Sequence, residues 1–150
     1  MKKFIALFLL SSIVFANENN EIPLEVYMAQ FDWKTGPSES LYVTYRCMGL
    51  TGLMWSMVNN SPDDVPEPLR VKLGNAQQTL RDWGENLYNS LNPENDRDFV
   101  ANVTKLILPM TNFYKQEMDK SNNTNDETFN LFIRSDIKLC KWWLENYREF

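Results

Sequence analysis

The side chains that most often carry out acid–base and metal chemistry in proteins are scarce in this chain. It has no histidine and only two cysteines among its 150 residues. Structural zinc sites take four ligands, drawn mainly from cysteine and histidine, and histidine is the commonest general base. We therefore expect no metal site and no cofactor, and any acid–base catalysis would depend on carboxylates, tyrosine or lysine.

One carboxylate, Asp136, lies on the apolar side of a predicted helix, three residues after Ile133 and four before Cys140. A buried acid needs a partner or takes up a proton. One interpretation is a general acid with a raised pKa, or a cation ligand. The other, which we favour, is a structural contact with an arginine or a hydroxyl, for which Arg46 and Thr51 are candidates.

The two cysteines are Cys47 and Cys140. An even number of cysteines in an oxidising compartment favours a disulfide over free thiols. The pair lacks the C-x-x-C spacing that tunes a thiolate for redox chemistry. We predict a structural disulfide that joins two helices.

The first sixteen residues have the three parts of a secretory signal peptide. Lys2 and Lys3 precede an apolar run from Phe4 to Phe15, and Val14 and Ala16 occupy the cleavage positions. The run is too short to span a bilayer, and no later segment is long and apolar enough to do so. We predict that residues 1–16 are removed and that the protein is periplasmic or secreted.

The charge of the mature chain argues against polyanionic partners. Removing residues 1–16 takes away two of the 15 basic side chains and none of the 20 acidic ones, which leaves a formal net charge of −7. Such an acidic surface repels phosphate backbones and anionic lipid. We expect neither nucleic-acid binding nor a membrane span.

The elements expected to position these residues are four helices that follow an N-terminal arm. The arm, residues 17–37, contains Pro23 and is expected to hold one helical turn; residues 38–150 form the helical domain. The first helix runs from about Ser38 to Asn59, and the second ends at Asn92. The second helix has the most regular apolar spacing, alternating four and three residues: Leu69, Leu73, Ala76, Leu80, Trp83 and Leu87.

A third helix is predicted to begin near Asn95, with Leu106 on its buried face. Pro109 lies inside it and predicts a kink or a break, because proline removes a backbone hydrogen bond. A polar link, Asp119–Asn125, then leads to a last helix from about Asp126 to Tyr147. The sequence thus predicts an all-α, antiparallel four-helix bundle stapled by one disulfide.

Aromatic residues suggest a binding surface. Trp142 and Trp143 are adjacent and project about 100° apart on a helix, so one of them should lie at the rim of the core. Together with Tyr147 and Phe150, or with Trp33 from the arm, it is predicted to form an exposed binding patch. The alternative is a rim tryptophan that the arm covers.

These features favour non-catalytic binding of a partner protein or a small apolar ligand. The competing hypothesis is a carboxylate-dependent hydrolase of the cell envelope. Two acids about 5–10 Å apart in a cleft, one with a raised pKa, would favour the hydrolase.

Overall fold

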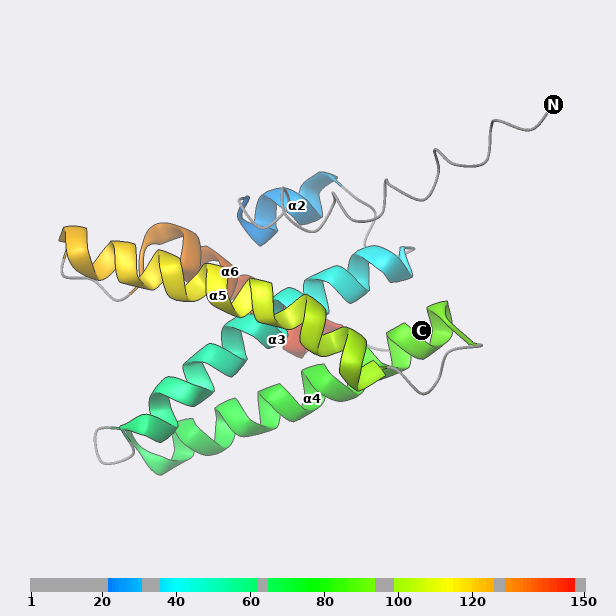
Figure 1. Ribbon diagram of the computed structural model, residues 1–150, viewed down its shortest axis with the longest axis horizontal. Coiled ribbons are helices and arrows are strands. Elements are labelled where there is room, and N and C mark those ends of the chain that lie inside the picture. Colours follow the sequence, from blue (N-terminus) through cyan, green and yellow to red (C-terminus); the bar gives the residue numbers. More distant parts are fainter. Residues whose placement is uncertain (1–21, 31–35, 62–64, 94–98, 126–128, 148–150) are drawn as a thin grey trace.

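The computed structural model describes residues 22–30, 36–61, 65–93, 99–125 and 129–147. They form five α-helices: α2 (Leu24–Gln30), α3 (Pro37–Asn60), α4 (Glu67–Leu91), α5 (Phe99–Asn125) and α6 (Leu131–Asn146) (Figure 1). No strand occurs in these ranges. The predicted all-α class is confirmed, but the predicted number of four helices is wrong because the arm contributes α2.

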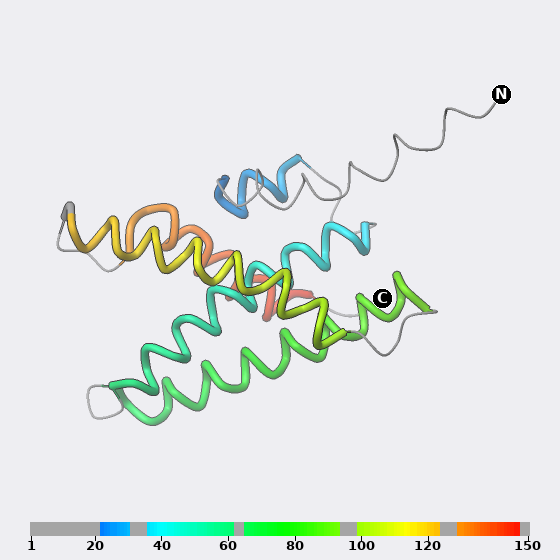
Figure 2. The backbone as a smooth tube through the Cα atoms, in the orientation of Figure 1, coloured from blue at the N-terminus to red at the C-terminus, as the bar shows by residue number. Residues whose placement is uncertain are grey.

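Helix α3 is the central element. It runs beside α4 as an antiparallel hairpin, and α5 crosses over it (Figure 2). Helix α6 contacts α3 as well, and α2 packs on α6. The stretch from Val43 to Thr51 is consequently buried on all sides. A helix enclosed in this way shows no single apolar stripe.

Local sequence explains where the helices begin. Pro37 opens α3 and Pro68 lies in the first turn of α4, where a missing amide costs no hydrogen bond. Asn130 caps α6, since its side chain accepts a hydrogen bond of 2.9 Å from the amide of Ile133. The sequence-based start of this helix, near Asp126, falls in a segment outside the described residues.

Helix α5 is longer and more continuous than predicted. It passes through Pro109 without a break and includes the segment Asp119–Asn125 that we expected to be a link. Met118 and Ser121 are buried, so tertiary contacts hold the polar end of this helix. Near Pro109, a Cβ atom added to Gly49 of α3 would lie 3.3 Å from the backbone nitrogen of Thr111, which shows how closely α3 and α5 approach.

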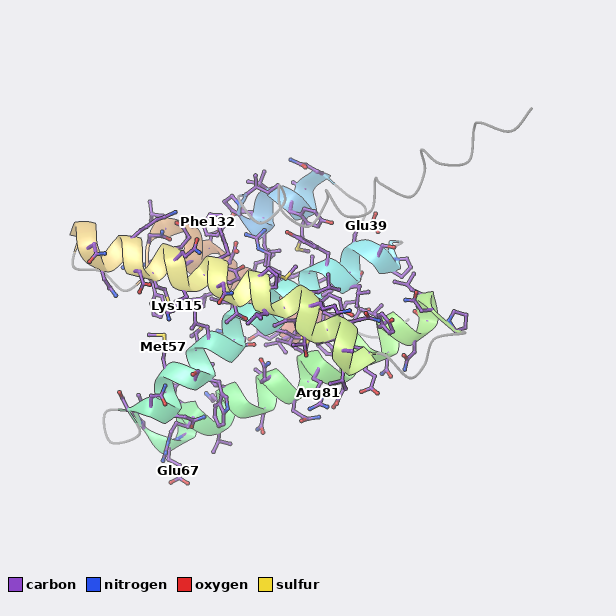
Figure 3. The ribbon with its side chains drawn as sticks, viewed as in Figure 1. Glu39, Met57, Glu67, Arg81, Lys115 and Phe132 are labelled. Carbon is purple, nitrogen blue, oxygen red and sulfur yellow. A yellow bond between two sulfur atoms is a disulfide. The ribbon has the colours of Figure 1, made fainter. Side chains whose placement is uncertain are left out.

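Two residues assigned to buried faces are in fact on the surface. Leu69, at the start of the regular stripe of α4, is 47% exposed, and Leu106 of α5 is 36% exposed. The stripe is buried only farther along α4, where Leu73 and Leu80 face the core. Charged side chains such as Glu67 and Arg81 project from the outer side of the same helix (Figure 3).

None of the described helices has the length and apolar character needed to cross a bilayer. The segment 1–16 that we predict to be a signal peptide is not among the described residues.

Candidate functional site

A buried ion pair joins α3 to α6. Arg46 of α3 and Asp136 of α6 are 1% and 0% exposed, and Nη2 of the arginine lies 2.8 Å from Oδ2 of the aspartate. Of the two partners weighed for Asp136 from the sequence, Arg46 is the one in contact with it. The hydroxyl of Thr51 instead bonds to the carbonyl of Cys47 and to the side chain of Gln77 on α4.

Two further donors complete the surroundings of the carboxylate. The hydroxyl of Tyr114, on α5, donates to Oδ2 of Asp136 at 2.5 Å and accepts a hydrogen bond of 2.9 Å from Nε of Arg46. The backbone amide of Leu24, the first residue of α2, donates to Oδ1 at 2.7 Å. We call the side chains of Arg46, Tyr114 and Asp136, together with the Leu24 amide, the polar hub. Four helices meet in it.

The hub is enclosed by aromatic rings. The guanidinium carbon of Arg46 lies 5.3 Å from the ring centre of Phe132 and 5.9 Å from that of Tyr114. Nη1 of Arg46 also donates to the hydroxyl of Tyr42 at 3.5 Å. A planar guanidinium stacks favourably on such rings. These contacts compensate for part of the loss of water around the arginine.

Burial has the largest effect on the pKa values of Asp136 and Tyr114 in the hub. Desolvation raises the pKa of Asp136 above its usual value, although Arg46, the Tyr114 hydroxyl and the Leu24 amide all favour the charged carboxylate. Desolvation likewise raises the pKa of Tyr114 well above its usual value. Because both groups are covered and already hydrogen-bonded, they are not placed to exchange protons with a substrate. The hub is suited to holding helices together.

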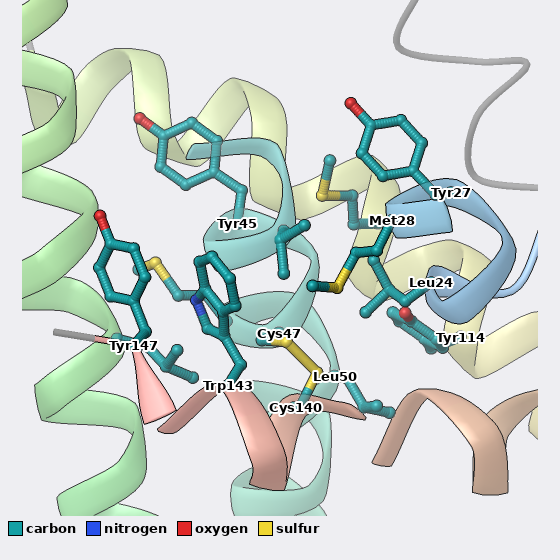
Figure 4. Packing of buried hydrophobic residues seen from close by; sticks show 14 of the residues in the cluster. Leu24, Tyr27, Met28, Tyr45, Cys47, Leu50, Tyr114, Cys140, Trp143 and Tyr147 are labelled. Atoms are coloured by element: carbon teal, nitrogen blue, oxygen red, sulfur yellow. A yellow bond between two sulfur atoms is a disulfide. The ribbon is translucent and has the colours of Figure 1, made fainter. Parts of the chain in front are cut away.

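A disulfide lies directly beside the hub. Cys47 follows Arg46 in α3, Cys140 lies one turn after Asp136 in α6, and their Cα atoms are 5.4 Å apart. Both cysteines are buried, and neither is a free thiol. The predicted disulfide is confirmed (Figure 4).

Another hydrogen bond extends the contact between α3 and α6. Nε1 of Trp143 donates to the hydroxyl of Thr44 at 3.1 Å. Trp143 also stacks on Tyr147 at 4.4 Å between ring centres, and Trp83 of α4 meets Tyr147 at 5.1 Å. The ion pair, the disulfide and this hydrogen bond thus connect the same two helices, and we call them the α3–α6 seam.

Among the described members of the predicted aromatic patch, Trp142 alone is exposed. Trp143 and Tyr147 are buried, because Trp143 has a hydroxyl partner inside the protein and Tyr147 packs between Trp143 and Trp83. Trp142, 37% exposed, is the member that lies at the rim. Trp33 and Phe150 lie outside the described residues.

Sequence reasoning missed two members of the hub. The sequence contains no pattern that links the hydroxyl of Tyr114 to Asp136, so this residue was not predicted as a partner of the carboxylate. The Leu24 amide was not predicted as a hydrogen-bond donor, because the sequence indicated only one helical turn in the arm where the structure has helix α2. A polar atom buried beside an arginine on a neighbouring helix gives no periodic signal.

The described ranges contain no group of three or more His, Cys, Asp or Glu side chains that could hold a metal ion. Comparison with known proteins gave no match, either to a protein family, to a curated protein or to a solved structure.

Proposed function

We propose that this chain is an exported protein that acts outside the cytoplasm, in the periplasm or the medium, by non-catalytic binding. Export is supported by the basic, apolar and small-residue parts of segment 1–16. The Cys47–Cys140 disulfide is compatible with an oxidising compartment.

The observation that carries the binding proposal is the state of the polar hub. Asp136, for which a general acid was the less favoured of two interpretations, is fully buried and accepts hydrogen bonds from three groups. An enzyme needs its perturbed acid within reach of substrate in a cleft. The cysteines are similarly committed to a disulfide. Asp136 and both cysteines therefore serve the interior of the protein, which favours a function carried by its surface.

An apolar strip on α5 supports a protein as the bound partner. Val100, Thr104 and Leu108 follow one another at intervals of four residues, so they share one side of the helix. Val100 is 65% and Leu108 is 56% exposed. Lys105 is the single charged residue between Phe99 and Tyr114. Exposed apolar side chains on a helix with so little charge are typical of contact surfaces.

Site-specific photo-crosslinking tests this proposal. A photoreactive amino acid is placed at Val100 or at Leu108, and the control position is Val71 of α4, which is also exposed. We expect a discrete crosslinked species from both α5 positions in cells that export the protein, and none from position 71. Equal crosslinking from all three positions, or none from any, would contradict binding through α5.

The competing hydrolase hypothesis is tested on the same purified protein. The mature chain is incubated with cell-wall glycan, and the release of soluble fragments is measured. We expect no release above that of the buffer.

The other form of binding, to a small apolar ligand, has its own test. Such a ligand would co-purify with the protein and appear as an added mass in native mass spectrometry.

A further inference from the structure

The N-terminal helix α2 is attached mainly through α6. The amide of Leu24 donates to Asp136 at 2.7 Å, and the hydroxyl of Ser135 donates to the Glu25 carboxylate at 3.5 Å. The side chains of Leu24, Tyr27 and Met28 are buried beneath α2. A helix of seven residues is too short to be stable by itself in water. Its structure therefore depends on the surface that receives it.

That surface is formed largely by α6 placed against α3, and Tyr27 of α2 also packs on Tyr42 of α3 at 4.3 Å between ring centres. Asp136 accepts the Leu24 amide on one oxygen and the Arg46 guanidinium on the other. One turn farther along α6, the disulfide fixes Cys140 to Cys47, the residue next to Arg46. The covalent bond therefore holds the carboxylate at the position where it meets both α2 and α3.

We propose that the docking of α2 is coupled to the Cys47–Cys140 disulfide, so that α2 docks when the bond is formed and is released when it is absent. The chemical step is thiol–disulfide exchange. Two thiols of the chain and one disulfide of an exchange partner give the internal disulfide and two partner thiols, and the partner accepts the two electrons and two protons. The polar hub transmits the change, because Asp136 contacts α2 directly.

The coupling has a use during export, and this part rests on the proposed function. Helix α2 begins at the eighth residue after the predicted cleavage at Ala16. In the reducing cytoplasm the cysteines remain thiols, so the segment behind the signal peptide stays undocked. Oxidation after translocation then fixes α6 and completes the N-terminal helix. The coupling itself is a property of the mature chain and is measured without any export step.

Hydrogen exchange of the mature chain tests the coupling. The comparison is between the oxidised wild type and the Cys47→Ala/Cys140→Ala variant, with the Leu24 amide as the direct reporter of docking. Loss of the disulfide should speed exchange in α2 by about tenfold or more and leave it nearly unprotected, while the α3–α4 hairpin, whose protection decreases with the overall stability, remains clearly protected. Equal protection of α2 in both proteins would overturn the proposal. Loss of protection to the same level in α2 and in the α3–α4 hairpin would also overturn it, because α2 would then report only the general loss of stability.

A second variant tests the hub with the disulfide intact. Asp136→Asn keeps the shape of the side chain but removes the charge that Arg46 and the Leu24 amide share. We expect faster exchange in α2, with an intact mass that shows the disulfide still closed. The control is Thr51→Val, which removes a buried hydroxyl of α3 that bonds within α3 and to α4. Unchanged α2 exchange in Asp136→Asn, or the same change in Thr51→Val, would contradict transmission through the hub.

Discussion

Replacing both cysteines by alanine should destabilise the protein by several kilocalories per mole. The bond joins residues 93 positions apart, so it removes much of the conformational freedom of the unfolded chain. The chain-entropy relation gives about 4.6 kcal/mol for a loop of this size, an upper value. The total free energy of unfolding of such a domain is about 5–15 kcal/mol, so the bond supplies a large part of it.

The same figure predicts the change in melting temperature. The entropy of unfolding is about 2.1 cal/mol/K per residue, or roughly 0.23 kcal/mol/K for the 110 residues that the structure describes. A loss of about 4.6 kcal/mol then corresponds to a decrease of roughly 20 °C in the melting temperature. Since Cys47 and Cys140 are both buried, the two small voids left by alanine add to the loss.

Thermal unfolding followed by circular dichroism measures this decrease. Adding reductant distinguishes the effect of losing the cross-link from the effect of the two voids on the melting temperature. Wild type and double alanine variant are each melted with and without excess dithiothreitol. Reductant should lower the melting temperature of the wild type once the bond has been opened, and it should leave the alanine variant unchanged. A double variant that melts within about 3 °C of the oxidised wild type would refute the reasoning, because a loop of this length could not then be constrained.

Two further predictions concern packing and pH. Gly49→Ala should lower the free energy of unfolding, measured in urea, by about 1–2 kcal/mol, because the added Cβ would lie 3.3 Å from the backbone of Thr111. The control is Gly52→Ala, whose added Cβ would meet only the flexible end of Gln77 at 3.4 Å. This control should be neutral or stabilising by up to about 1 kcal/mol. Equal effects would contradict the close approach of α3 and α5. Burial raises the pKa of Tyr27 from 10.0 to about 12, so the unfolded chain ionises first and stability should fall as pH rises through this range, by about 1–3 kcal/mol. A Tyr27→Phe variant should show a shallower fall in alkaline unfolding curves, and an identical curve would mean that Tyr27 is not buried.

Regular features of the sequence, such as apolar spacing and the number of cysteines, predicted part of the fold correctly. The spacing along α4 placed Leu73 and Leu80 in the core, and the even number of cysteines indicated the disulfide. Patterns failed where a contact between helices overrides local preference. Pro109 suggested a break, yet α5 continues through it, next to the point where it packs closely on Gly49.

The polar hub shows why the rest could not be predicted. Asp136 was noticed because it interrupts an apolar face, but the groups that donate hydrogen bonds to it come from three other helices. Which arginine, hydroxyl or amide meets a buried acid depends on how the helices cross, and a single sequence does not encode this as a periodic signal. Helix α2 was underestimated for the related reason that its seven residues gain their stability from docking.

The central proposal, an exported protein that folds with its disulfide closed, is tested most directly by one intact-mass measurement. The full chain, starting at Met1, is expressed in a bacterium with an oxidising periplasm, and the protein is purified from the periplasmic fraction without reductant. We expect a mass that begins at Asn17 and is two hydrogen atoms below that of the dithiol form, with no reaction of the denatured protein with a thiol reagent. A soluble protein that retains residues 1–16, or one that reacts at both Cys47 and Cys140, would contradict the proposal.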